Sequence, residues 1–132
     1  MKIEDYIQYW LQGAKHDFEV AETLFNEEKY DWCLFIGHLV IEKTLKAMLV
    51  QYSQKESVVK THNLLKIAQL ANLDLTDEMK LDLLSFNDFN LEVRYPVYKT
   101  NFYEKCNKSF AEEYFSKIKE SYKCLLLMMQ NL

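Results

Sequence analysis

Apolar residues recur at steps of three and four along most of this chain, which is the period of an amphipathic α-helix. The first such stretch covers residues 4–28, and its apolar stripe consists of Ile3, Ile7, Trp10, Leu11, Ala14, Phe18, Ala21 and Phe25. The second, residues 31–52, is apolar almost all the way round, and Asp31 is its predicted N-cap. Such a helix is normally surrounded by protein. We therefore predict a central helix, packed on all sides by the bundle or partly by a second subunit.

Two further helices are predicted in the middle of the chain. A short one covers residues 63–71, after a polar loop, and a longer one covers residues 77–94 with Thr76 as its N-cap. Pro96 ends the longer helix, because the residue before a proline avoids helical angles. Residues 95–108 are then predicted to form a long loop of about 14 residues, a length that is usually functional in a compact domain.

The last predicted helix begins at Ser109, which has the spacing of a capping box with Glu112. Its apolar stripe consists of Ala111, Phe115, Ile118, Tyr122, Leu125 and Met129. No segment has the pattern of a strand. Four long helices and one short one predict an all-α fold, an antiparallel four-helix up-and-down bundle with a short extra helix. The 132 residues are one domain's worth of chain, so we expect a single helical domain over residues 1–132.

The composition narrows the function classes. The chain has only two glycines, Gly13 and Gly37, so neither a P-loop nor a GxGxxG phosphate loop can be written. The formal net charge is −4, so any RNA site has to be a local basic region rather than a general property of the surface.

The cysteines and the N-terminus indicate the compartment. Cys33, Cys106 and Cys124 are odd in number and form no CxxC pair, which favours reduced thiols over disulfides. The N-terminal residues include early acids and lack the apolar core of a signal peptide. No apolar run approaches the roughly 20 residues of a membrane span. We expect a cytoplasmic protein without a membrane partner.

Metal and cofactor chemistry have little support in the sequence. His16, His38 and His62 lie on separate predicted elements, and no HExxH motif is present. His62, at the start of the short helix, is expected to be a capping or packing residue. Cys33 lies in an apolar stretch, where a thiol is normally inert. We therefore expect no metal site and no cofactor.

Three polar residues interrupt the central apolar helix. His38, Glu42 and Lys46 follow one another at intervals of four, so they lie on one side of it. Burying an unpaired charge is costly. The pattern therefore indicates either a structural Glu42–Lys46 ion pair beside a hydrogen-bonded histidine, or a polar seam along a ligand cleft or dimer groove.

A second candidate region follows the fourth predicted helix. Arg94, the only arginine in the chain, comes one turn after Asn90, and its planar guanidinium suits phosphate or carboxylate. It could equally compensate the helix dipole or pair with Glu42. The next segment interleaves aromatic residues with lysines, namely Tyr95, Tyr98, Lys99, Phe102, Tyr103, Lys105 and Lys108. Such a segment can stack bases and contact phosphates, although an aromatic protein interface is the favoured interpretation.

Together these residues resemble a known family. Residues 35–50, FIGHLVIEKTLKAMLV, resemble the second helix of HEPN domains (higher eukaryotes and prokaryotes nucleotide-binding). Further matches in the correct order are the first-helix residues Trp10, Ala14, Asp17 and Ala21, the "tHdL" stretch Thr61, His62, Asn63 and Leu64, and the turn Arg94, Tyr95 and Pro96. The resemblance implies a helical bundle that is usually dimeric. It also implies a small nucleotidyltransferase as a partner, as in toxin–antitoxin pairs of the MNT/HEPN kind, and for many members a metal-independent ribonuclease activity.

The resemblance also implies a catalytic motif that is incomplete here. Ribonuclease members carry an R-x4-6-H motif after the fourth helix, with the arginines and histidines of two subunits facing each other across the dimer groove. Arg94 matches the arginine, but Lys99, Thr100 and Asn101 occupy the positions where the histidine is expected, and no histidine follows His62. A lysine with an ordinary pKa near 10.4 is a poor proton shuttle at neutral pH.

Three functions are compatible with this pattern. The favoured one is a non-catalytic, homodimeric module that binds a nucleotidyltransferase partner and a nucleotide or RNA, with Arg94, Asn90, Lys99, His38, Glu42 and Lys46 as candidate ligand-binding residues. The alternative is a metal-independent endoribonuclease with a degenerate site, in which Lys99 and His38 replace the missing histidine beside Arg94. The third is a purely structural dimer without a ligand. In each case the apolar flank of the second helix and the aromatic segment are the expected dimer surface.

Overall fold

The computed structural model describes residues 2–56, 59–94 and 96–130, and the side chains of residues 91–94 and 96–100 lie outside this description. Within these ranges the chain forms six helices and no strand, so the predicted all-α class is confirmed. The helices are α1 (Ile3–Asn26), α2 (Tyr30–Ser53), α3 (Leu64–Leu70), α4 (Asp77–Arg94), α5 (Pro96–Lys105) and α6 (Lys108–Gln130). None of the helices in the described ranges has both the length and the apolar character needed to cross a bilayer.

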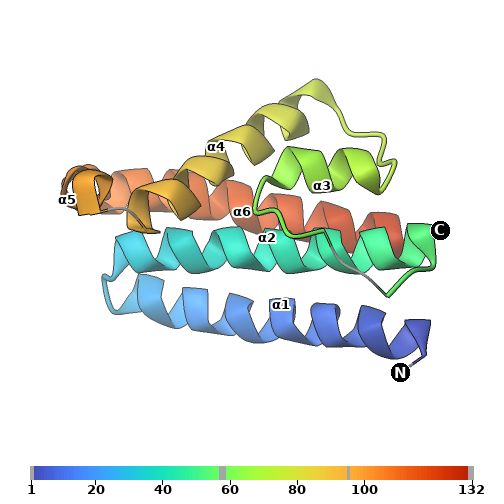
Figure 1. The fold of residues 1–132 in the computed structure, drawn as a ribbon. Coiled ribbons are helices and arrows are strands. Elements are labelled where there is room, and N and C mark those ends of the chain that lie inside the picture. Colours follow the sequence, from blue (N-terminus) through green and yellow to red (C-terminus); the bar gives the residue numbers. More distant parts are fainter. Residues whose placement is uncertain (1, 57–58, 95, 131–132) are drawn as a thin grey trace.

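The second helix is the centre of the molecule, as its sequence predicts. α2 contacts each of the other five helices. Figure 1 shows α1 along one side of α2 and α3, α4 and α6 on the others, with α6 ending at the end of the bundle where α1 begins. Fifteen residues of α2 are buried, including those on its polar side. The same helix therefore contributes side chains both to the core and to the candidate site.

The main hydrophobic core lies between α2, α3, α4 and α6. Leu34, Ile41, Phe86 and Ile118 are fully buried in it, and each such side chain contributes about 1.5–3 kcal/mol through its removal from water. The α2–α6 contact is especially close at Gly37. A Cβ atom there would lie 2.7 Å from Cδ1 of Ile118.

Two predicted helix starts need correction. α2 begins at Tyr30, and Asp31 lies inside its first turn, where a carboxylate is stabilised by the helix dipole without acting as the N-cap. The N-cap of α6 is Asn107 rather than Ser109, because Oδ1 of Asn107 accepts the backbone N–H of Phe110 at 2.8 Å. The prediction that Thr76 is the N-cap of α4 is confirmed, since its Oγ1 accepts the N–H of Met79 at 3.1 Å.

The predicted long loop after α4 is wrong. Pro96 ends α4 as expected, but it also begins α5, because a proline is well suited to the first turn of a helix. α5 is fixed to the bundle by Phe102, which is buried and packs on Phe89 of α4 with 5.7 Å between ring centroids. The aromatic segment is therefore a short helix, and the true connection to α6 is two residues long.

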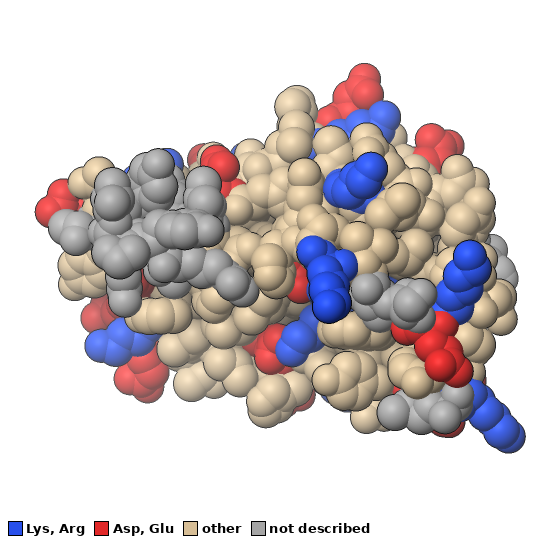
Figure 2. Space-filling model, viewed as in Figure 1, with Lys and Arg blue, Asp and Glu red and all other residues tan. Residues whose placement is uncertain are grey.

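Charged side chains are spread unevenly over the surface. Figure 2 shows several lysine side chains over the part of the molecule where α3 lies, separated by uncharged surface and with acidic side chains nearby. Between residues 43 and 73 the sequence has five lysines and one acidic residue, in a chain whose net charge is −4. Lys43 and Lys46 are paired with Asp17 and Glu42, so the local basic character of this stretch comes from the exposed Lys55, Lys60 and Lys66.

Candidate functional site

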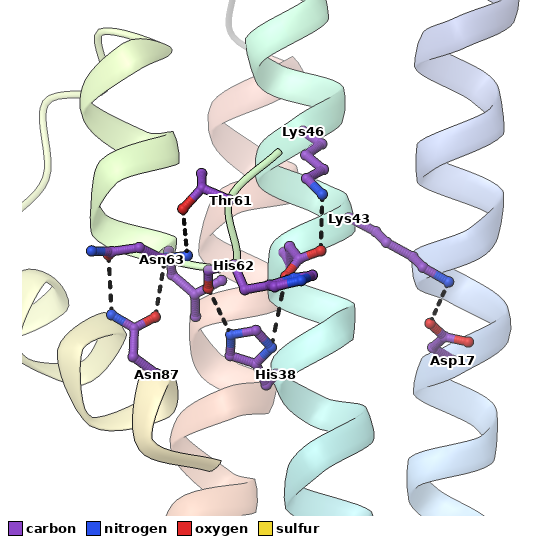
Figure 3. A network of polar contacts seen from close by, with 10 residues as sticks. Asp17, His38, Lys43, Lys46, Thr61, His62, Asn63 and Asn87 are labelled. Atoms are coloured by element: carbon purple, nitrogen blue, oxygen red, sulfur yellow. Dashed lines mark hydrogen bonds and ion pairs between the residues drawn. The ribbon is translucent and has the colours of Figure 1, made fainter. Parts of the chain in front are cut away.

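The buried carboxylate of Glu42 is the centre of the polar site on α2. Its Oε2 accepts a hydrogen bond from Nζ of Lys46 at 3.0 Å, and its Oε1 lies 2.8 Å from Nδ1 of His62 (Figure 3). Glu42 and Lys46 are 5 % and 8 % exposed. The predicted ion pair therefore exists, and it includes a third member, His62, that the sequence did not assign to it.

Two opposing effects set the charge of Glu42. Burial acts to raise its pKa, whereas the hydrogen bonds from Lys46 and His62 and the nearby positive charge of Lys46 lower it. The lowering effects prevail, so the pKa of Glu42 lies below its ordinary value of 4.5 and the group is ionised at neutral pH. An ionised carboxylate accepts hydrogen bonds only, so the proton of the His62–Glu42 bond is on Nδ1 of His62.

His38 anchors the loop that carries His62. The ring of His38 is fully buried, and its Nε2 lies 3.0 Å from the backbone carbonyl oxygen of His62. Because a carbonyl oxygen cannot donate, Nε2 of His38 is the protonated nitrogen. Its Nδ1 faces Oε1 of Glu42 at 4.0 Å. One turn of α2 thus holds both the main chain and the side chain of His62.

Asparagines fix the same loop from the other side. Oδ1 of Asn87, on α4, accepts the N–H of Leu64 at 2.9 Å, and its Nδ2 donates to Oδ1 of Asn63 at 3.1 Å (Figure 3). Asn63 is the N-cap of α3 through the N–H of Lys66, and Thr61 Oγ1 accepts the N–H of Asn63 at 3.2 Å. Residues 61–64 are therefore held by α2 and α4 together.

The lysines of α2 also have defined partners. Nζ of Lys46 lies 5.2 Å from the ring centroid of Trp10, a cation–π contact with α1. Nζ of Lys43 pairs with Oδ2 of Asp17 at 2.7 Å. Both lysines contribute to holding α1 against α2, in addition to any effect on a ligand.

The structure brings three of the predicted site residues together and places the others on neighbouring helices. His38, Glu42 and Lys46 form one network, as described above. Asn90 is 8 % exposed on α4, and Arg94 is the last residue of that helix. Lys99 belongs to α5. The side chains of Arg94 and Lys99 fall outside the described residues, so their predicted contacts with a ligand or with Glu42 stay predictions.

Sequence reasoning missed the roles of His62 and Asn87. The sequence favours a capping or packing role for His62, yet its ring bonds to a carboxylate 20 residues earlier in the chain. The sequence did contain a signal for these partners, namely the charged and polar residues on an otherwise apolar helix. A glutamate and a histidine on an apolar helix require partners, and the polar stretch before α3 was the nearest source of them.

Other chemistry has less support in the described part of the chain. Burial raises the pKa of Cys33 to about 12, with Cys106 adding to the rise and Lys119 opposing it, so this thiol is protonated and inert. Among the described residues, no three histidine, cysteine or acidic side chains come together in a way that could hold a metal ion.

Comparisons with known proteins identify the family of this chain and agree with its fold. The HEPN domain model matches residues 7–127, so the chain belongs to the HEPN domain family. Its fold is similar to that in the crystal structure of TT1696 from Thermus thermophilus, with a TM-score of 0.73 over 90 % of this chain and 94 % of that chain. The two sequences are 19 % identical, so this likeness concerns the fold. A comparison with curated protein sequences found no match.

Proposed function

We propose that this protein is a non-catalytic HEPN module that acts as a homodimer and binds the phosphate group of a nucleotide or an RNA. Arg94 and Lys99 supply part of the site, and a minimal nucleotidyltransferase is its protein partner in a toxin–antitoxin-like pair. The observation that supports the lack of catalysis is the state of His38. It is fully buried, and its protonated nitrogen bonds to the His62 carbonyl.

A ribonuclease without the motif histidine would need another proton shuttle. His38 would have to break its bond to the loop and leave the core to reach an RNA bound at Arg94. A general base must lie within hydrogen-bonding reach of the proton that it removes. His16 is exposed on α1 and does not belong to the network of Glu42, Lys46 and His62. The degenerate-ribonuclease alternative therefore depends on Lys99, although a lysine with an ordinary pKa is protonated at neutral pH, or on the half-exposed ring of His62.

Cleavage of RNA in the absence of metal tests this proposal. Wild type, Arg94→Ala and Lys99→Ala are purified identically and incubated with a labelled RNA in EDTA. We expect the same background for all three proteins. Cleavage by wild type that Arg94→Ala abolishes would establish the ribonuclease alternative instead.

The dimer is tested by light scattering at micromolar concentration. Trp32 at the start of α2 and Tyr103 on α5 are 40 % and 67 % exposed, and such exposed aromatic surface is typical of an interface. We expect twice the mass of one chain for wild type, and a shift towards the monomer for the Trp32→Lys, Tyr103→Lys double variant. A monomeric wild type would contradict the proposal.

The partner and the ligand each have a direct test. Purification of the tagged protein from its own cells should bring a nucleotidyltransferase with it. A thermal-shift panel of nucleotides and short RNAs should raise the melting temperature for at least one phosphate-bearing ligand. If none does so, the purely structural dimer is the better description.

A further inference from the structure

We propose that His62 is the residue through which this module contacts the phosphate group, and that Glu42 and His38 position it. This inference rests on the phosphate-binding part of the proposed function. It adds a residue on a different element from Arg94, and it assigns the buried α2 network to positioning rather than to direct contact.

The hydrogen bond to Glu42 determines which edge of the His62 ring is available. Nδ1 donates to a carboxylate that is almost completely buried, while the His62 side chain is 48 % exposed. Nε2 lies on the opposite edge of an imidazole ring from the bonded side. In its protonated form Nε2 donates to a phosphate oxygen, and such a charge-assisted bond is among the stronger hydrogen bonds in proteins.

The loop holds this ring in place before any ligand arrives. The carbonyl of His62 accepts from His38, the N–H of Leu64 is bound by Asn87, and Thr61 and Asn63 close the turn between them. A group fixed by packing and surrounding hydrogen bonds loses little freedom on binding. The loop backbone is therefore fixed by several contacts and the half-exposed ring by its bond to Glu42, which is what a recognition site requires.

The surroundings of His62 favour an anion. Lys60 and Lys66 are close to it in the sequence, one on either side, and Lys60 is exposed. The negative charge of Glu42, which bonds to His62, is already paired with Lys46. Glu56, the one acidic residue between residues 43 and 73, accepts a hydrogen bond from Tyr6 on α1 at 3.4 Å. Ammonium groups beside a fixed imidazole attract and retain a phosphate.

Glu42, His38 and Lys46 cannot take this part themselves. Their exposed fractions are 5 %, 0 % and 8 %, and each already has a partner within the network. Their contribution is to fix the position and the protonation pattern of His62. A ligand that reaches this face meets His62 and the loop lysines first.

Fluorescence anisotropy with a fluorescein-labelled oligouridine RNA, in EDTA and low salt, tests the inference. The decisive variant is His62→Asn, because the side-chain amide of asparagine can still donate to Glu42 from near the Nδ1 position but has nothing at Nε2. We expect about tenfold weaker binding with an unchanged melting temperature. His16→Asn, at an exposed histidine of α1, is the matched control and should bind like wild type.

Lys60→Gln provides a second test. Because this side chain is exposed, its replacement should leave the fold of the loop unchanged. Loss of one phosphate contact should lower the slope of log affinity against log salt by about 0.7. ATP as a competitor identifies the source of the phosphate. If ATP displaces the RNA, a mononucleotide is sufficient, and if it does not, the RNA backbone is the ligand.

Two results would overturn the inference. One is a wild-type protein that binds neither the RNA nor ATP. The other is a wild type that binds while His62→Asn binds equally well. In that second case, weaker binding by Arg94→Ala would leave the proposed function standing and remove His62 from it.

Discussion

Glu42 is the residue on which the loop between α2 and α3 depends. Its carboxylate holds Lys46 from its own helix and His62 from the loop, and the nearly buried charges of Glu42 and Lys46 would otherwise be unpaired. Buried ion pairs of this kind contribute little net stability compared with an apolar core. Removing one member is nevertheless costly, because it leaves the other charge buried.

Glu42→Gln should therefore destabilise the protein considerably. The amide keeps the shape of the side chain but leaves the nearly buried ammonium of Lys46 without a counter-charge. We expect the free energy of unfolding, measured in urea, to fall by about 3 kcal/mol. Glu113→Gln on the exposed side of α6 is the control and should change it by less than about 0.5 kcal/mol. Equal stability of both variants would show that Lys46 does not need Glu42.

Lowering the pH should also remove the contribution of the Glu42 carboxylate to the free energy of unfolding. The pKa of Glu42 in the folded protein lies below 4.5, because the hydrogen bonds from Lys46 and His62 outweigh the effect of burial. The contribution is thus complete above pH 4.5 and is lost as the pH falls through the folded value. We expect the stability difference between wild type and Glu42→Gln, followed by urea unfolding at a series of pH values, to shrink below pH 4.5. A difference that stays constant into that acid range would contradict the assignment.

For the individual residues of this network, the sequence indicated the Glu42–Lys46 pair but not the bond from His62 to Glu42. The spacing of Glu42 and Lys46 within one helix was sufficient to predict their pair. The bond from His62 could not be predicted in the same way, because it depends on the path of the loop across α2, which no local pattern encodes.

Among the helices, the short α5 and the start of α6 show how neighbouring signals compete. Pro96 ends one helix and begins the next, and the aromatic and basic residues after it lack a clear apolar stripe, so the segment resembled a loop. Phe102 and its contact with Phe89 supply the packing that holds it as a helix. The long helices were predictable because their apolar period is repeated over many turns.

The cap of α6 can be measured directly. Asn107→Ala removes the oxygen that accepts the Phe110 N–H, and we expect a loss of about 1 kcal/mol in urea unfolding. Ser109→Ala, at the residue that the sequence favoured as the cap, should change stability by less than about 0.5 kcal/mol. A larger loss of stability for Ser109→Ala than for Asn107→Ala would show that Ser109 is the N-cap after all.

The contact between α2 and α6 should be intolerant of a single methyl group. Gly37→Ala places a Cβ 2.7 Å from Cδ1 of Ile118, which is fully buried. We expect a loss of about 1–2 kcal/mol in the free energy of unfolding, although alanine favours helix by about 1 kcal/mol over glycine.

Two variants control for this interpretation. Gly13→Ala, whose Cβ meets only the flexible side chain of Lys43 at 3.3 Å, should be as stable as wild type or more so. Ile118→Val, which removes Cδ1, should recover part of the loss when combined with Gly37→Ala. Equal thermal midpoints for Gly37→Ala and wild type would contradict the close approach.

At the scale of the whole molecule, the apolar α2 does two things at once. It is the core of the bundle, and it carries the polar residues that hold the loop before α3 on the basic face (Figure 1). The fold could be predicted from helical periodicity and from the order of the motifs. The site could be predicted only in part, since the described contacts come from α2, α4 and the loop between α2 and α3, which lie far apart in the sequence.

The central claim is that this HEPN protein holds a phosphate-bearing ligand without cleaving it. The most direct measurement is to incubate wild type with labelled RNA in EDTA, and to analyse the bound fraction and the length of the RNA in the same sample. We predict that the RNA is retained by the protein and recovered intact. RNA shortened by wild type, and left intact by Arg94→Ala, would contradict the account.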